Sequence, residues 1–120
     1  MGRCRVVAPG VVRLPLSEGD YLDVQRELNA GQYMQLLTAL VERKPFAKAI
    51  AYVVGWSLVG LDGQPLAYDF DVPEEVRRQT LGALDKATLR EINAALDRHE
   101  AAEDAALEAK KKTPESVPAS

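Results

Sequence analysis

The sequence predicts one α+β domain, in which a small antiparallel sheet of three or four strands is packed by two or three helices and followed by a helical C-terminal extension. Three observations predict this fold class. The first part of the chain has the strand–turn–strand pattern of a β-hairpin, and apolar residues then recur at helical spacing. Near the C-terminus, helical propensity continues after the apolar stripe has ended. The expected organisation is an irregular arm over residues 1–10, a globular domain over 11–98, a solvated helical extension over 99–112 and a disordered tail over 113–120.

A β-hairpin is the first predicted element. Residues 11–16 and 21–24 have strand character, and the Ser-Glu-Gly-Asp segment between them is typical of a turn. Pro15 has no backbone N–H to donate to a neighbouring strand, so we expect the first strand to lie at an edge of the sheet.

A helix is predicted to follow and to begin after Asn29. Asn29 is a good N-cap residue, and Gln32 follows it at the spacing of a capping box. Apolar residues at helical spacing then form a stripe that we expect to face the core, which comprises Tyr33, Leu36, Leu37, Leu40 and Val41. The helix should end near Arg43-Lys44, because Pro45 disfavours helical backbone at the residue before it.

Residues 46–59 leave two alternatives open. In the first, a short helix gives way to a buried strand, because the later residues are rich in β-branched and aromatic side chains. In the second, the helix continues to Trp56. We favour the strand, followed by a turn at 61–65 and a further strand at 66–68 that pairs back on it.

Two more helices are predicted in the C-terminal half. The first should be capped by Asp71 and carry Pro73 in its first turn, and Asp85 should cap the long final helix. Leucine and isoleucine form an apolar stripe on this last helix as far as residue 98, beyond which the same face becomes polar. The predicted core anchors of the whole domain are Trp56, Leu36, Leu40, Leu89, Ile92 and Leu96.

The composition argues against most catalytic chemistry. The 120 residues include one cysteine and one histidine, so neither a Cys-rich zinc site nor a two-histidine metal site can be built. The glycines do not form a phosphate-binding loop, and the acidic residues follow the spacing of solvated helix faces. The net charge of −3 and the lack of a dense basic stripe argue against nucleic acid, and no apolar run is long enough to span a bilayer. We therefore expect no enzymatic activity, no cofactor, no metal, and neither a nucleic-acid nor a membrane partner.

Several short motifs follow one another in an order that resembles a known family. They are the hairpin, the helix start Glu-Leu-Asn-Ala-Gly-Gln-Tyr at 27–33, the Trp-Ser-Leu segment with its Asp-Gly-Gln-Pro-Leu turn at 56–66, the Leu-Asp-x-x-Thr-Leu helix start at 84–89, Ile92, and Asp-Arg-His-Glu at 97–100. In this order, over residues 11–100, they resemble the tail assembly chaperones of long-tailed bacteriophages.

The resemblance implies a protein that binds the phage tape-measure protein and keeps it soluble while the tail tube assembles. The tail tube protein and a second copy of the chain are further candidate partners. It also implies action in the cytoplasm of the infected bacterium and absence from the mature virion. The alternative is a structural virion protein, such as a tail or head–tail connector subunit. A third class, a host regulatory or adaptor protein, has the same composition.

Partner contacts are expected on the hairpin and on the C-terminal extension, because an edge strand and an unpartnered helix are both docking elements. The candidate contact residues are Leu14, Tyr21, His99 and Leu107.

Overall fold

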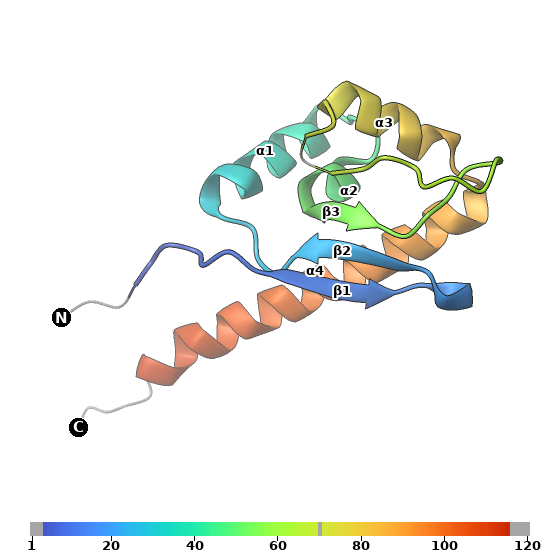
Figure 1. The fold of residues 1–120 in the computed structure, drawn as a ribbon. Helices are drawn as coiled ribbons and strands as arrows, with labels where there is room; N and C mark the ends of the chain where they lie inside the picture. The colour runs from blue at the N-terminus through green and yellow to red at the C-terminus, as the bar shows by residue number, and fades with distance from the viewer. Residues whose placement is uncertain (1–3, 70, 116–120) are drawn as a thin grey trace.

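A three-stranded antiparallel sheet and four α-helices make up the computed structural model, which describes residues 4–69 and 71–115 (Figure 1). The α+β class, the antiparallel sheet and the C-terminal helix are therefore confirmed. The elements follow in the order β1 (Val11–Pro15), the 3-10 turn η1 (Ser17–Gly19), β2 (Tyr21–Gln25), α1 (Ala30–Val41), α2 (Ala47–Tyr52), β3 (Val53–Trp56), α3 (Glu74–Ala83) and α4 (Lys86–Glu115).

The sheet has the strand order β1-β2-β3, so the predicted hairpin and the edge position of Pro15 are both confirmed. The central strand β2 buries Leu22 and Val24 completely, as expected for alternate residues of a strand that faces a core. On the opposite face of the hairpin, Arg13 forms a bidentate ion pair with Asp23, with a shortest N–O distance of 2.9 Å. This alternation fixes which face of the sheet receives the helices.

Helix α1 begins where its sequence predicts. The Asn29 side chain accepts a hydrogen bond from the Gln32 N–H, and the Gln32 side chain accepts one from the Asn29 N–H, both at 2.9 Å. This is the predicted capping box, and it satisfies two backbone donors that the first helical turn leaves free. The helix ends at Val41, and Arg43 then adopts a left-handed conformation with φ 57° as the chain reverses.

The segment after α1 contains both a short helix and a strand. Helix α2 ends at Tyr52 and β3 begins at Val53, so the alternative of a helix that continues to Trp56 is wrong. Val53 pairs with β2, where a β-branched residue packs well. The predicted strand at residues 66–68 is absent from the described chain: one isolated bridge joins Val59 to Pro65.

Helix α4 is the longest element and passes behind the sheet in Figure 1, with its C-terminal end projecting beyond the other elements. Its 30 residues correspond to a rod about 45 Å long. Because α4 continues through Glu115, the predicted tail from residue 113 is wrong in its first three residues, and residues 116–120 lie outside the described part. None of the described helices is both long and apolar enough to cross a membrane.

The two predicted caps in the C-terminal half differ in outcome. Asp71 does not cap α3, because Pro73 is the residue that precedes its first turn, and the Asp71 N–H instead donates to the Asp69 side chain at 2.8 Å. Asp85 does cap α4, since its carboxylate accepts hydrogen bonds from the N–H of Thr88 at 2.7 Å and from the Thr88 hydroxyl at 2.9 Å.

Replacing Asp85 by Ala is expected to lower the urea midpoint of unfolding at neutral pH, because α4 loses its N-cap acceptor. The Thr88 N–H lowers the pKa of Asp85, so the carboxylate stabilises the folded state above the unfolded pKa of about 3.9. That contribution is lost as the pH falls through the lower folded-state pKa. The difference in urea midpoint between the parent protein and Asp85→Ala should therefore shrink in acid. Asp85→Asn keeps an acceptor and is the control; an equal loss in both variants would contradict the capping role.

The core lies between the sheet, α2 and α4. Of the predicted anchors, Ile92 and Leu96 are completely buried and Leu36 is nearly so. Trp56 and Leu89 are half-buried, and the Trp56 indole stacks against Tyr68 with ring centroids 4.4 Å apart while its Nε1 donates to the Leu66 carbonyl. Leu40 is exposed, so its assignment to the core is wrong.

Candidate partner-binding groove

Most of the large apolar side chains of helix α1 are exposed to solvent. Leu36 is its only fully buried residue, whereas Tyr33, Met34, Leu40 and Val41 are all exposed. The apolar stripe was predicted correctly as a helix pattern but wrongly as a core face. The reason is geometric: α1 contacts the body mainly through α2 and therefore buries a narrow strip of its circumference.

The exposed side of α1 forms one wall of a groove whose other wall is α4. We call it the α1–α4 groove, and its volume is about 490 Å³. Its lining comprises Leu28, Asn29, Ala30, Tyr33, Leu36, Leu37, Leu40, Tyr52, Glu100, Glu103, Asp104 and Leu107. The groove is thus apolar on the α1 side and acidic on the α4 side.

Hydrogen bonds from the body fix the acidic wall of the groove. The Glu103 carboxylate accepts one hydrogen bond from the Leu28 N–H at 2.8 Å and another from the Tyr52 hydroxyl at 2.5 Å. Glu100 lies 2.9 Å from the Lys48 ammonium, which also contacts Asp97. These contacts hold α4 against the β2–α1 connection and α2, and they orient two of the three carboxylates.

The local electrostatics of the groove are negative. None of the described residues that line it is a lysine or an arginine, whereas three are carboxylates. Burial raises the pKa of the Tyr52 phenol, and the hydrogen bond and negative charge of Glu103 raise it further, with smaller contributions from Glu100 and Asp104. The groove therefore disfavours anions and attracts cationic groups.

Stability is expected to fall as the pH rises above about 10, by up to about 1.4 kcal/mol per pH unit for each protected tyrosine. Burial raises the pKa of Tyr52, and it raises that of Tyr68 to about 12. In the unfolded chain both phenols ionise near pH 10. Their contribution to the free energy of unfolding is therefore complete below that pH and is lost as the pH rises towards the pKa values of the folded state. Urea unfolding between about pH 8 and 11 measures the slope. Tyr52→Phe should reduce it, whereas the exposed Tyr33→Phe should not; equal slopes in both would contradict the assignment.

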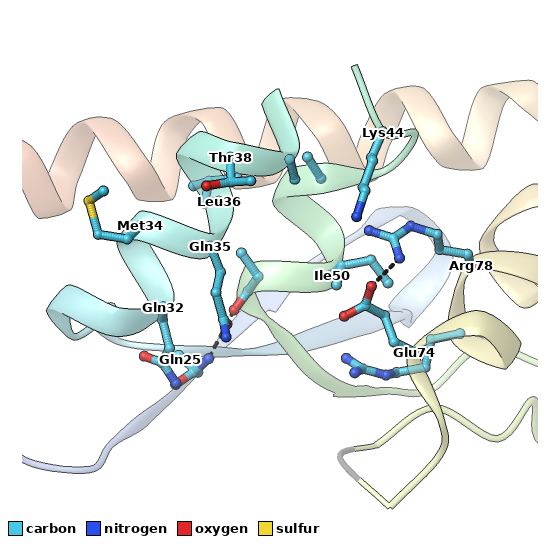
Figure 2. Close-up of a pocket in the computed structure, with 14 residues that line it drawn as sticks. Gln25, Gln32, Met34, Gln35, Leu36, Thr38, Lys44, Ile50, Glu74 and Arg78 are labelled. Atoms are coloured by element: carbon cyan, nitrogen blue, oxygen red, sulfur yellow. Dashed lines mark hydrogen bonds and ion pairs between the residues drawn. The ribbon is translucent and has the colours of Figure 1, made fainter. Parts of the chain in front are cut away.

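A second groove lies between α1, α2 and α3, with a volume of about 440 Å³ (Figure 2). Gln25 and Gln32 are hydrogen-bonded to each other at one end, at 2.9 Å. Arg78 forms an ion pair with Glu74 at the other end and lowers the pKa of that carboxyl group. Lys44 and Arg77 line this groove as well, so beyond the Arg78–Glu74 pair its lining carries an excess of positive charge, opposite in sign to the α1–α4 groove.

Neither a metal-binding cluster nor a thiol lies at either groove among the described residues. In the described part of the chain, no group of three or more His, Cys, Asp or Glu residues is placed to hold a metal ion. The exposed thiol of Cys4 lies near the N-terminus and donates weakly to the Val6 carbonyl. What the α1–α4 groove can do chemically is to bury apolar side chains and attract cations.

The four predicted contact residues do not lie together. Leu107 is 42% exposed and lines the α1–α4 groove. Leu14 is half-buried against the core, and Tyr21 is half-buried with the Arg13 guanidinium 3.6 Å from its ring centroid. His99 is half-buried beside Tyr52, and its Nε2 lies 2.9 Å from the Gln25 carbonyl oxygen.

The contacts of His99, Glu100 and Glu103 correct the expected start of the solvated extension. Residues 99–103 dock on the body through polar side chains, so the part of α4 that contacts the body extends at least to Glu103. Sequence reasoning also missed the pairing of this segment with α1. The available signal was the acidic spacing of Glu100, Glu103 and Asp104, which repeats at helical intervals.

The comparisons with known proteins identify no relative. No protein-family model matches the chain, and neither a curated protein nor a solved structure is similar enough to it to count as a match. The resemblance to phage tail assembly chaperones therefore stays a prediction from the sequence motifs.

Proposed function

We propose that this protein is a non-enzymatic binding protein that keeps a phage tape-measure protein soluble during tail assembly. The observation that carries the proposal is the exposed apolar face of α1, where Tyr33, Leu40 and Val41 are about half exposed or more. Large apolar side chains exposed together on one helix are a feature of interaction sites in folded domains.

The form of the grooves also supports a binding role. A chaperone that is displaced as the tube assembles needs several weak contacts that can be exchanged, and it does not need one deep pocket. Two grooves flank α1, and each combines exposed side chains with buried ones. Together with the order of sequence motifs, this favours a chaperone over an enzyme.

In this proposal the protein acts in the cytoplasm of the infected bacterium and leaves before the virion is complete. The tape-measure protein is the principal partner, and the tail tube protein and a second copy of the chain are secondary candidates. The α1 face would cover apolar stripes that a long helical protein exposes before the tube encloses it.

Co-expression with the tape-measure protein of the same phage tests the proposal. The soluble yield of the tape-measure protein and its co-purification with this chain are compared with expression of the tape-measure protein alone. We expect soluble, co-purifying tape-measure protein. If it stays insoluble and unbound while this chain is found in stoichiometric amounts in purified particles, the chaperone function is wrong and the protein is a structural virion subunit.

A further inference from the structure

The walls of the α1–α4 groove restrict what can bind there. Both walls are helices, and the backbone groups of helix interiors are already hydrogen-bonded within the helix. The groove thus offers side chains and no free strand edge. An extended peptide that entered it would bury its own N–H and C=O groups without partners, which is costly. A helical partner satisfies these groups internally and avoids the cost.

The dimensions of the groove suit a short helical segment. Helix α1 has 12 residues and is about 18 Å long, which corresponds to about three turns of a parallel helix. Tyr33, Leu37 and Leu40 lie along this wall at helical spacing, and Leu107 lies on the facing wall. Apolar anchors on a partner at positions i, i+3 or i+4, and i+7 would meet them, as in other helix-in-groove complexes.

The negative charge of the groove determines which charged residues a partner helix should carry beside its apolar stripe. Glu100, Glu103 and Asp104 line the groove from α4, and no described lysine or arginine lines it. Lys48 pairs with Glu100 from outside the lining, so Glu103 and Asp104 supply the negative charge that is not compensated by an ion pair. A partner with acidic residues facing α4 would be repelled, whereas lysine or arginine there would be attracted. Of the three carboxylate residues, Asp104 is exposed whereas Glu100 and Glu103 are half-buried, so Asp104 is the most accessible to a partner.

We propose that the α1–α4 groove binds an amphipathic helix whose apolar stripe is flanked by lysine or arginine on the side that faces α4. The inference rests on the proposed function for the identity of the natural partner, and it deepens that function by assigning the groove and the class of helix.

A second copy of this chain fits the groove less well. Its own exposed apolar helix, α1, contains no charged residue over Ala30–Val41, so it could not form ion pairs with the acidic residues of α4. Two copies paired through α1 would also place their acidic α4 walls close together. Charge complementarity thus favours a different, basic-flanked helix as the occupant.

Two synthetic peptides test the proposal directly. Both are amphipathic helices of about five turns with the same leucine stripe; one carries lysine beside the stripe and the other glutamate. Fluorescence anisotropy of the labelled peptides measures their affinity for the full chain at low salt. We expect the lysine peptide to bind at least about tenfold more tightly than the glutamate peptide.

Two pairs of variants locate the binding. Leu40→Gln removes an exposed apolar side chain from the groove wall and should weaken the lysine peptide about tenfold. Its matched control, Val11→Gln, replaces an exposed residue outside the groove and should bind as the parent does. Asp104→Lys should weaken the lysine peptide and strengthen the glutamate peptide, whereas Asp62→Lys, an exposed turn residue, should change neither. Circular dichroism checks that each variant is folded.

The outcomes separate this inference from the proposed function. Equal binding of both peptides, with no response to Asp104→Lys, would overturn the inference, as would a dimer of the protein alone that Leu40→Gln dissociates. If the tape-measure protein co-purifies equally with Leu40→Gln and Val11→Gln, the function stands and the groove assignment fails. If the lysine peptide binds as expected but no form of the chain binds the tape-measure protein, the groove stands and the function fails.

Discussion

Leu36→Ala is expected to lower the free energy of unfolding by about 2–4 kcal/mol, whereas Leu40→Ala should change it by less than about 0.5 kcal/mol. The two leucines lie one helical turn apart on α1 and belong to the same apolar stripe. Leu36 is 3% exposed and Leu40 is 47% exposed. Truncating Leu36 removes buried methyl groups and leaves a cavity, while Leu40 already contacts water. Urea unfolding followed by the fluorescence of Trp56 measures both changes.

The size of the Leu36 effect has a structural limit. Leu36 lines both grooves that flank α1, so neighbouring side chains can move into part of the space it leaves. We therefore expect a loss below the upper end of the range measured for buried leucines. Comparable losses for Leu36→Ala and Leu40→Ala would contradict the exposed position of Leu40, since only a buried stripe would make the two residues equivalent.

Most features of the fold that depend on local chemistry were predictable from the sequence, although the Asp71 cap of α3 was not. The Asn29–Gln32 capping box, the Asp85 cap and the hairpin turn each need a few residues at fixed spacing, and the structure contains all three. Strand alternation likewise placed the hairpin correctly. Rules of this kind act within one turn of backbone, so no knowledge of distant segments is required.

Features that depend on which segments meet were not predictable. The spacing of the α1 stripe gives a helix but does not say how much of the helix other elements cover, and so Leu40 was placed in the core. The predicted strand at residues 66–68 did not form, and there the Leu66 carbonyl accepts a hydrogen bond from the Trp56 indole instead of from a neighbouring strand. The α1–α4 groove brings together residues that are about 70 positions apart in the sequence, and no local sequence pattern predicts that contact.

Glu103→Ala is expected to destabilise the protein by about 1–3 kcal/mol. Glu103 lies in the helical segment that sequence reasoning assigned to solvent, yet its carboxylate accepts hydrogen bonds from the Leu28 N–H and the Tyr52 hydroxyl. Removing it leaves two partly buried donors without an acceptor. Equilibrium unfolding measures the total loss, and hydrogen exchange at the Leu28 amide reports on the local one.

Three variants test whether the loss comes from these hydrogen bonds. Glu108→Ala, at an exposed position on the same helix, should be nearly neutral. Glu103→Gln keeps one acceptor and should retain much of the stability. Combined with Tyr52→Phe, Glu103→Ala should cost less than the sum of the two single changes, because both remove the same contact. Additive losses with unchanged exchange at Leu28 would mean that Glu103 does not fasten α4 to the body. Since the same carboxylate forms part of the acidic wall, loosening it should also widen the α1–α4 groove and weaken the lysine peptide.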